Sequence, residues 1–235
     1  MKWEFVEDDK IAFPANIGPV ILTRIRALEH RNSDGVNDEV NIGDLGGYIE
    51  REWNLSQNDR LSADMLQNSS RHYWNIPSGK AWVANGAYVF GHARVTGNAY
   101  LGPNVYLHDC AMLLDNAMVA GRRGGNANIG GTTRVMNNIT IIGSVAATGN
   151  TMFYGNGIIS NNSGELDLSD LRSLFLYDDI QITAYGGYSS DIRGDVVLGP
   201  GWRLSLKKTD LDYEQSSSGN IRIYGSNGFI IKSPA

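Results

Sequence analysis

The sequence predicts an all-β protein built around a left-handed parallel β-helix. Three observations predict this fold: the chain repeats every six residues from Ala81 to Asn162, a small residue opens most repeats, and an aliphatic residue stands two positions later. The phase survives a four-residue insertion at 123–126. Side chains alternate between the two faces of a strand, so the first and third positions of each repeat (hexad) should point into one core.

Three six-residue sides make one coil of about 18 residues, and stacked strands lie about 4.8 Å apart. The thirteen hexads therefore predict a little over four coils. Burial of each third-position aliphatic side chain is worth about 1.5–3 kcal/mol. The third positions hold Val83, Val89, Val95, Leu101, Leu107, Leu113, Val119, Ile129, Val135, Ile141, Ala147, Phe153 and Ile159.

The flanking segments predict further β structure. Residues 1–60 should form a small N-terminal β cap, because 2–6 and 20–28 alternate polar and apolar residues. Residues 61–80 should connect the cap to the hexads, with His72-Tyr73-Trp74 as a plug for the open end of the stack. Residues 163–235 should continue the helix in a looser, irregular form, with loops at 185–190 and 209–219 and a final strand pair at 221–235.

Composition narrows the function classes. The net charge is −5 with a pI near 5.3, and no basic tract exists, which argues against binding to nucleic acid or to an anionic membrane. No apolar run approaches the ~20 residues that span a bilayer, and the charged start is unlike a signal peptide. One cysteine, Cys110, cannot form an internal disulfide. A bacterial or phage-infected host cytoplasm is the expected location.

Three motifs precede the repeats: Arg24-Ile25-Arg26-Ala27-Leu28, then GDLGGYIE at 43–50, then Asn54-Leu55-Ser56-Gln57. This order, followed by GHARVTGNAYL, resembles a family of short proteins from tailed phages, prophages and enteric bacteria. In that family a similar module leads into G-[ND]-A-R-V repeats, with Trp where this chain has Tyr48, and some members are labelled hexapeptide transferases. The resemblance covers roughly residues 18–120 and implies a left-handed β-helix, without an established activity.

The regular body also resembles the hexapeptide acyltransferases, which implies an enzymatic alternative. Those enzymes are trimers that bind acyl-CoA between subunits and use a histidine as general base. Under this alternative His92 and His108 are the candidate bases, since they lie sixteen residues apart and so nearly one coil apart. The Arg122-Arg123 loop would then contact a phosphate of acetyl-CoA.

Other chemistries find less support in the sequence. Four histidines and one cysteine are spread along the chain without metal-ligand spacing, so no metal site is predicted. There is no G-x-S-x-G elbow and no dinucleotide fingerprint. We therefore predict a chain that works without catalysis and without a cofactor.

The second position of each hexad should point outward, which predicts exposed side chains at Trp82, Tyr88, Arg94, Tyr100 and Tyr106. Hexads three apart share one side, so Trp82 should stack on Tyr100 and Tyr88 on Tyr106. Such apolar columns predict an interface. The simplest partner that would bury them is another copy of the chain, and a trimer is favoured over a dimer.

These features and the resemblance predict a non-catalytic binding protein, encoded by a phage or prophage, that acts on a host or viral protein. A role in host takeover or against host defence would fit such a protein. The acyltransferase is the alternative, and a structural part of a virion tail or fibre is the third possibility.

Overall fold

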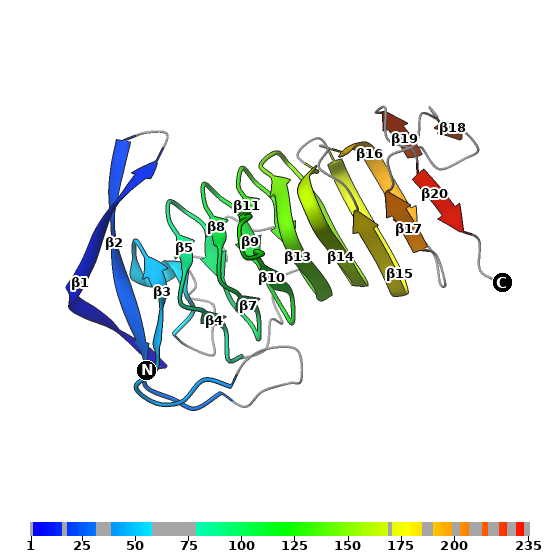
Figure 1. The fold of residues 1–235 in the computed structure, drawn as a ribbon. Coiled ribbons are helices and arrows are strands. Elements are labelled where there is room, and N and C mark those ends of the chain that lie inside the picture. Colours follow the sequence, from blue (N-terminus) through cyan, green and yellow to red (C-terminus); the bar gives the residue numbers. More distant parts are fainter. Residues whose placement is uncertain are drawn as a thin grey trace, which may run out of the picture.

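The structure is a computed structural model that describes residues 2–15, 18–31, 39–57, 79–168, 171–184 and 190–198, and four later strands. Side chains are described in these ranges as far as Ser160, and at Leu168. The aromatic group expected to plug the stack, at 72–74, lies outside the described residues. Figure 1 shows strands of successive turns lying side by side along one axis, from the N-terminal hairpin to the C-terminal strands.

The hexads form a parallel β-solenoid of about four turns between residues 82 and 160. Each strand pairs in parallel with the strand one turn later, as in β4–β7–β10, β5–β8–β11 and β6–β9–β12. The strands are β4 (Trp82–Val83), β5 (Ala87–Val89), β6 (Arg94–Val95), β7 (Tyr100–Leu101), β8 (Val105–Leu107), β9 (Met112–Leu113), β10 (Met118–Ala120), β11 (Ala127–Ile129), β12 (Arg134–Val135), β13 (Asn138–Ala147) and β14 (Met152–Asp167). The insertion stays in a corner, where Arg122 and Gly125 form an isolated bridge.

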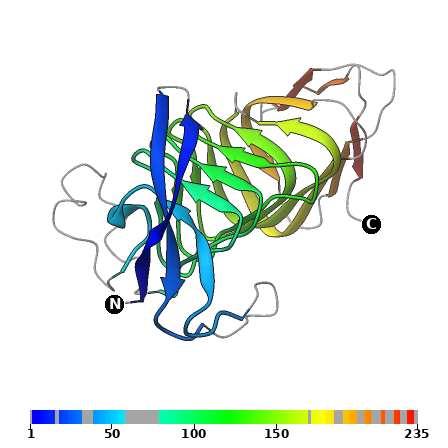
Figure 2. The same cartoon turned by 60° about the vertical axis from the view of Figure 1, so that its left-hand side comes forward.

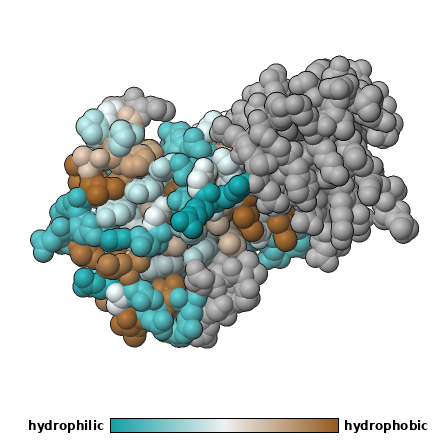
Figure 3. Space-filling model, viewed as in Figure 1, coloured by the Kyte–Doolittle hydropathy of each residue, from teal (hydrophilic) through white to brown (hydrophobic). Residues whose placement is uncertain are grey.

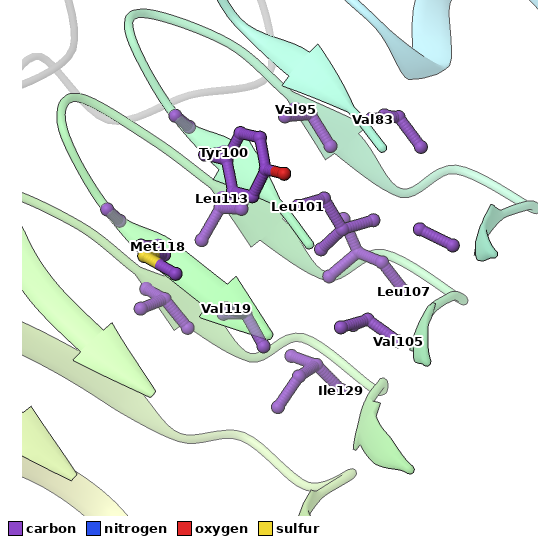
Figure 4. Packing of buried hydrophobic residues seen from close by; sticks show 14 of the residues in the cluster. Val83, Val95, Tyr100, Leu101, Val105, Leu107, Leu113, Met118, Val119 and Ile129 are labelled. Atoms are coloured by element: carbon purple, nitrogen blue, oxygen red, sulfur yellow. The ribbon is translucent and has the colours of Figure 1, made fainter. Parts of the chain in front are cut away.

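The predicted inward positions are confirmed. Every third-position side chain from Val83 to Ile159 is at most 1% exposed, and the first-position side chains from Ala81 to Thr151 are at most 5% exposed. Figure 4 shows Leu101, Leu107 and Val119 projecting into the interior between the strands. The aliphatic core is therefore a direct consequence of the six-residue period.

The corners are made by residues that tolerate a left-handed backbone. Asn104, Asp109, Asp115 and Asn137 have φ between 57° and 60°, and glycines such as Gly97 (φ 73°) occupy equivalent corners. Glycine, asparagine and aspartate adopt this region at the least cost. This agrees with the predicted role of the polar and glycine positions that end each hexad.

One corner also carries a column of exposed asparagines. Nδ2 of Asn98 donates to Asn116 Oδ1 at 3.0 Å, Nδ2 of Asn116 donates to Asn138 Oδ1 at 2.9 Å, and Asn138 donates to Asn156. Such amide ladders add side-chain hydrogen bonds in the same direction as the backbone ladder. The column stabilises the stacking of successive turns.

The N-terminal segment is β-rich, as expected. β1 (Trp3–Ala15) pairs antiparallel with β2 (Gly18–Ala27), and β2 pairs antiparallel with β3 (Leu45–Ile49); a 3-10 turn, η1 (Glu52–Asn54), follows. Figures 1 and 2 show the β1–β2 hairpin standing at the N-terminal end of the stack.

Part of this segment belongs to the solenoid, although residues 1–60 were predicted to form a separate cap. β3 pairs in parallel with β5, matching Ile49 with Val89, and Leu55 forms a parallel bridge with Val95. Ile49 and Leu55 are both fully buried and six residues apart, as inward hexad positions are. Two sides of an earlier coil therefore lie at 47–57.

The C-terminal third continues the parallel stack through β15 (Leu171–Ala184), β16 (Ser190–Leu198) and β17 (Arg203–Leu206). Both strands predicted at 221–235 are present, but they do not pair with each other. β19 (Ile221–Tyr224) pairs antiparallel with β16 and with β18 (Tyr213–Gln215), which lies in the expected loop, whereas β20 (Phe229–Lys232) pairs antiparallel with β17. The last turns leave open backbone edges, and these strands supply their hydrogen-bond partners.

In the described part of the chain, none of the helices has the length and apolar character that crossing a bilayer requires.

Candidate functional site

The outward second positions of the hexads form three columns, one on each side of the solenoid. The parallel register places Trp82 beside Tyr100, Tyr88 beside Tyr106 and Arg94 beside Met112, which confirms the two predicted stacks. We name the sides after their columns: the tryptophan wall (Trp82, Tyr100, Met118, Thr140, Ile158), the tyrosine wall (Tyr48, Tyr88, Tyr106, Asn128, Ala146) and the arginine–methionine wall (Arg94, Met112, Arg134, Met152).

The exposure predicted for the tryptophan wall is wrong at its N-terminal end. Trp82 is 7% exposed and Tyr100 is 4% exposed. The guanidinium carbon of Arg31 lies 5.0 Å from the Tyr100 ring centroid, and Arg31 Nη2 donates to the Asn98 carbonyl at 3.2 Å. A Cβ built on Gly46 would lie 2.8 Å from Cζ2 of Trp82. The chain covers these two rings itself, so they need no second copy.

Further along the same wall, apolar side chains reach the surface. Ile142 is 38% exposed and Ile158 is 42% exposed, on neighbouring strands β13 and β14. Figure 3 shows that on the face seen in Figure 1, hydrophobic residues lie in separate groups among hydrophilic ones.

The tyrosine wall is half-buried under the β1–β2 hairpin. The rings of Tyr48, Tyr88 and Tyr106 stack with centroids 5.9 Å and 5.4 Å apart. Phe13, near the tip of the hairpin, lies 5.1 Å from Tyr88, 5.2 Å from Phe90 and 5.5 Å from Tyr106. Aromatic contacts of this kind add stability beyond the area that they bury. The predicted interface residues Tyr88 and Tyr106 therefore hold the hairpin against the stack.

A polar network joins the hairpin to the first two motifs. The Tyr48 hydroxyl donates to Asp9 Oδ1 at 2.8 Å, and Arg24 Nη1 lies 3.2 Å from Asp9 Oδ2. Arg24 also donates to the Gly46 carbonyl at 3.2 Å and to Asn85 in the first corner of the hexads. The residues that carry the family resemblance thus fix the N-terminal segment in place.

The same network shifts two pKa values. The hydrogen bond from Tyr48, helped by Arg24, holds the pKa of Asp9 below its ordinary value, although partial desolvation opposes this. Burial, and then the hydrogen bond to Asp9, raise the pKa of Tyr48. Both shifts favour the charged carboxylate and the neutral phenol that the network uses.

Tyr48→Phe should raise the pKa of Asp9, because it removes the largest cause of the lowering. Since the folded pKa of Asp9 is depressed, the network stabilises the protein above the ordinary carboxyl pKa and loses this effect as pH falls through the lowered value. NMR titration of the Asp9 carboxyl measures the shift. Tyr106→Phe is the control, since the Tyr106 hydroxyl instead contacts Asn126. An Asp9 pKa that is the same in Tyr48→Phe and the wild type would contradict the network.

The third motif is also structural. Asn54 is fully buried; its Nδ2 donates to the carbonyls of Gly91 (3.2 Å) and Ala93 (2.7 Å), and its Oδ1 accepts from the backbone of Arg51 at 2.7 Å. Gln57 accepts from the Lys2 backbone at 2.9 Å and donates to the Trp3 carbonyl at 2.7 Å. These amides tie 54–57 to the next coil and to the start of the chain.

The two candidate bases have different partners. His92 is exposed and its ring stacks parallel to Trp53, with centroids 6.4 Å apart. His108 is partly buried: Nε2 lies 2.7 Å from Asn128 Oδ1 and Nδ1 lies 3.0 Å from Asp109 Oδ2. A general base needs a nitrogen lone pair directed at the substrate. Both nitrogens of His108 already face oxygen atoms of the protein.

The remaining candidates lie at exposed corners. Arg122 ends a hexad and Arg123 opens the insertion; both are exposed, and the backbones of Arg122 and Gly125 exchange hydrogen bonds of 2.9 and 3.0 Å. Cys110 is a free, exposed thiol at another corner. Among the residues that the structure describes, no group of three or more His, Cys, Asp or Glu side chains could hold a metal ion.

The arginine–methionine wall has a different character from the other two. Its column residues are all partly exposed, and a second column beside it holds Leu114, Met136 and Tyr154. No carboxylate occupies the outward positions of β6, β9, β12 or the start of β14. Arginine, methionine and tyrosine are the residue types that protein interfaces favour.

Arg94 is the notable member of this wall. Its guanidinium has neither a hydrogen-bond acceptor nor a carboxylate partner among the residues with described side chains. Partial burial lowers its pKa, and the nearby Cys110 thiol acts in the opposite direction. An arginine keeps its charge under such conditions. The wall therefore presents a partly desolvated cation that a carboxylate would stabilise.

No protein-family model matches this chain, and no curated protein matches it. The three walls are therefore the features from which a function can be proposed. Arg94 was predicted to face outward from the hexad period, whereas its neighbours Met112, Arg134 and Met152 were not predicted as part of a site. They could have been found from the sequence, because Met112, Arg134 and Met152 stand at the second positions of hexads that follow Arg94 at intervals of one coil.

Proposed function

We propose that the protein is a non-catalytic interaction protein, a left-handed β-helix that binds another protein through its arginine–methionine wall. The observation that carries this proposal is the partly buried Arg94, which has no carboxylate partner among the residues with described side chains and stands in a column with methionines. The aromatic residues of the other two walls are instead covered at their N-terminal ends by Arg31 and Phe13.

The left hand of the coil is supported by the six-residue period, by the small residues that open the hexads, and by the resemblance to hexapeptide-repeat proteins. A crystal structure reads the hand directly. A right-handed coil would contradict this part of the proposal.

The resemblance to proteins of phages, prophages and enteric bacteria supports a host or viral protein as the partner. It also supports an accessory role in the cytoplasm of an infected or lysogenic bacterium. The acidic net charge supports a protein partner over nucleic acid or membrane. Recovery of the chain in purified virions would support a tail or fibre component instead.

A homo-oligomer, trimer before dimer, remains part of the proposal. Because the chain itself buries Trp82 and Tyr100, these two rings no longer argue for a subunit interface. Ile142 and Ile158 are the exposed apolar pair that a second copy would cover. Light scattering measures the mass, and a monomer at micromolar concentration would contradict the oligomer.

The binding proposal is tested by capture from host lysate with two matched double variants. R94E/R134E reverses two charges on the wall, and R122E/R123E reverses two charges at an exposed corner, so the net charge changes equally. The wild type and the corner variant should retain the same captured protein, and the wall variant should lose it. Equal retention by all three proteins would contradict the proposal.

Calorimetric titration with acetyl-CoA tests the enzymatic alternative on the same samples. We expect no heat of binding. Micromolar binding that is lost in His92→Ala or His108→Ala would favour the acyltransferase.

A further inference from the structure

The residues of the arginine–methionine wall alternate along the axis of the solenoid. Arg94 pairs in register with Met112, Met112 with Arg134, and Arg134 with Met152. Neighbouring strands lie about 4.8 Å apart, so like residues recur every two strands, at about 9.6 Å. The wall thus repeats cation and thioether with a fixed spacing.

This spacing matches one type of protein segment. In an α-helix, residues seven apart lie on nearly the same side and are separated by about 10.5 Å along the axis. Residues i+3 and i+4 lie about 4.5–6 Å along the helix axis from residue i, near the midpoint between i and i+7. In an extended strand, side chains on one side recur at about 6.7 Å, which places no second residue near 9.6 Å.

From this match we infer that the wall binds an acidic amphipathic α-helix of a partner protein, lying along the solenoid axis. Carboxylates at positions i and i+7 of the helix face Arg94 and Arg134. An apolar residue at i+3 or i+4 contacts Met112 between them, and the next apolar residue contacts Met152. This inference rests on the proposed function and names the chemistry of its partner.

The surroundings of the column favour such a helix. Met136 and Tyr154 lie beside the column, are partly exposed, and offer apolar contact to the flank of a helix. Methionine side chains adapt to varied partner surfaces, and amphipathic helices are commonly recognised by apolar faces with a few polar anchors. Arg94 has already lost part of its hydration in the free protein, so pairing with a carboxylate costs less additional desolvation.

A second copy of the chain does not supply this ligand from its described residues. The helix in those residues is limited to η1, which has three residues. A heptad match needs at least eight residues of α-helix. The inference therefore takes the helix from a different protein, since the described part of this chain offers none.

The test uses a fluorescein-labelled helical peptide with Glu at i and i+7 and Leu at i+3 and i+4, and the full chain. Fluorescence anisotropy should show micromolar binding. A peptide of the same composition with the two Glu moved to the opposite side of the helix should bind about tenfold more weakly or worse. R94E/R134E should weaken binding by a similar factor, whereas R122E/R123E should leave it unchanged.

A charge swap provides the strictest comparison. The peptide with Lys in place of both Glu should bind R94E/R134E better than it binds the wild type, while circular dichroism shows that the variant keeps its fold. Two results would overturn the inference. The wild type could bind both Glu peptides with equal affinity, or R122E/R123E could weaken peptide binding as much as R94E/R134E does. If the peptide fails but lysate capture still depends on Arg94 and Arg134, the helical ligand is wrong and the binding function stands. If neither peptide binding nor lysate capture depends on Arg94 and Arg134, the helical ligand and the proposed binding function are both wrong.

Discussion

Leu107→Ala should lower the free energy of unfolding by about 2–5 kcal/mol, because it opens a cavity in the middle of the stack. Leu107 is fully buried in β8, and its neighbours in register are Val89 and Ile129. Each turn of a solenoid buries its apolar side chains against the turns on either side. A cavity at Leu107 therefore weakens two interfaces between turns.

Urea unfolding followed by circular dichroism and by tryptophan fluorescence measures this effect. Leu45→Ala removes the same atoms at a site that is 44% exposed, and it should change stability by less than about 1 kcal/mol. If the two variants were equally stable, the interior would not be the continuous core described above. Transitions that differ between the two probes would show that the turns unfold separately.

The regular hexads could be predicted from the sequence because their period follows directly from strand geometry. Once Val83, Val95 and Leu107 share a phase, the inward direction of each is determined by alternation along the strand. All three are at most 1% exposed. The corner residues were equally accessible to prediction, since few residue types accept a left-handed backbone.

The earlier coil at 47–57 could not be recognised as easily. Ile49 and Leu55 keep the six-residue spacing, but Gly47 and Trp53 do not resemble the alanines that open the later hexads. Their partners Val89 and Val95 lie forty residues further along (89 − 49 and 95 − 55), whereas regular neighbours in the stack are eighteen apart. The inserted residues hide the repeat.

The covering of the aromatic columns was also beyond the sequence. The hexad period predicts that Trp82 and Tyr100 lie one above the other on outward positions, and the register confirms this stack, but both rings belong to the buried hydrophobic cluster. What lies over them depends on Arg31 and Gly46, which come from the irregular N-terminal segment. Contacts between segments so distant in the chain carry no periodic signal, so the rings were wrongly expected to be exposed.

The motifs of the N-terminal segment gain a physical explanation that the resemblance alone did not provide. Arg24 and Tyr48 act with Asp9 in one hydrogen-bonded network, and Asn54 satisfies backbone groups of the first hexads. These residues hold the segment against two walls of the solenoid.

Three residues allow the walls to be compared under equal conditions. Met112, Asn128 and Thr140 occupy the second position of their hexads, one on each wall, and all three are partly exposed. A photo-crosslinking amino acid at each site, in otherwise identical proteins, reports which wall a partner touches. The reactive group at Met112 would lie between Arg94 and Arg134.

Site-specific photo-crosslinking in host lysate is therefore the most direct test that one wall of this solenoid is its binding surface. A discrete adduct with a host protein should form from position 112 and be absent from positions 128 and 140. Host-protein adducts from 128 or 140 with none from 112 would contradict the account.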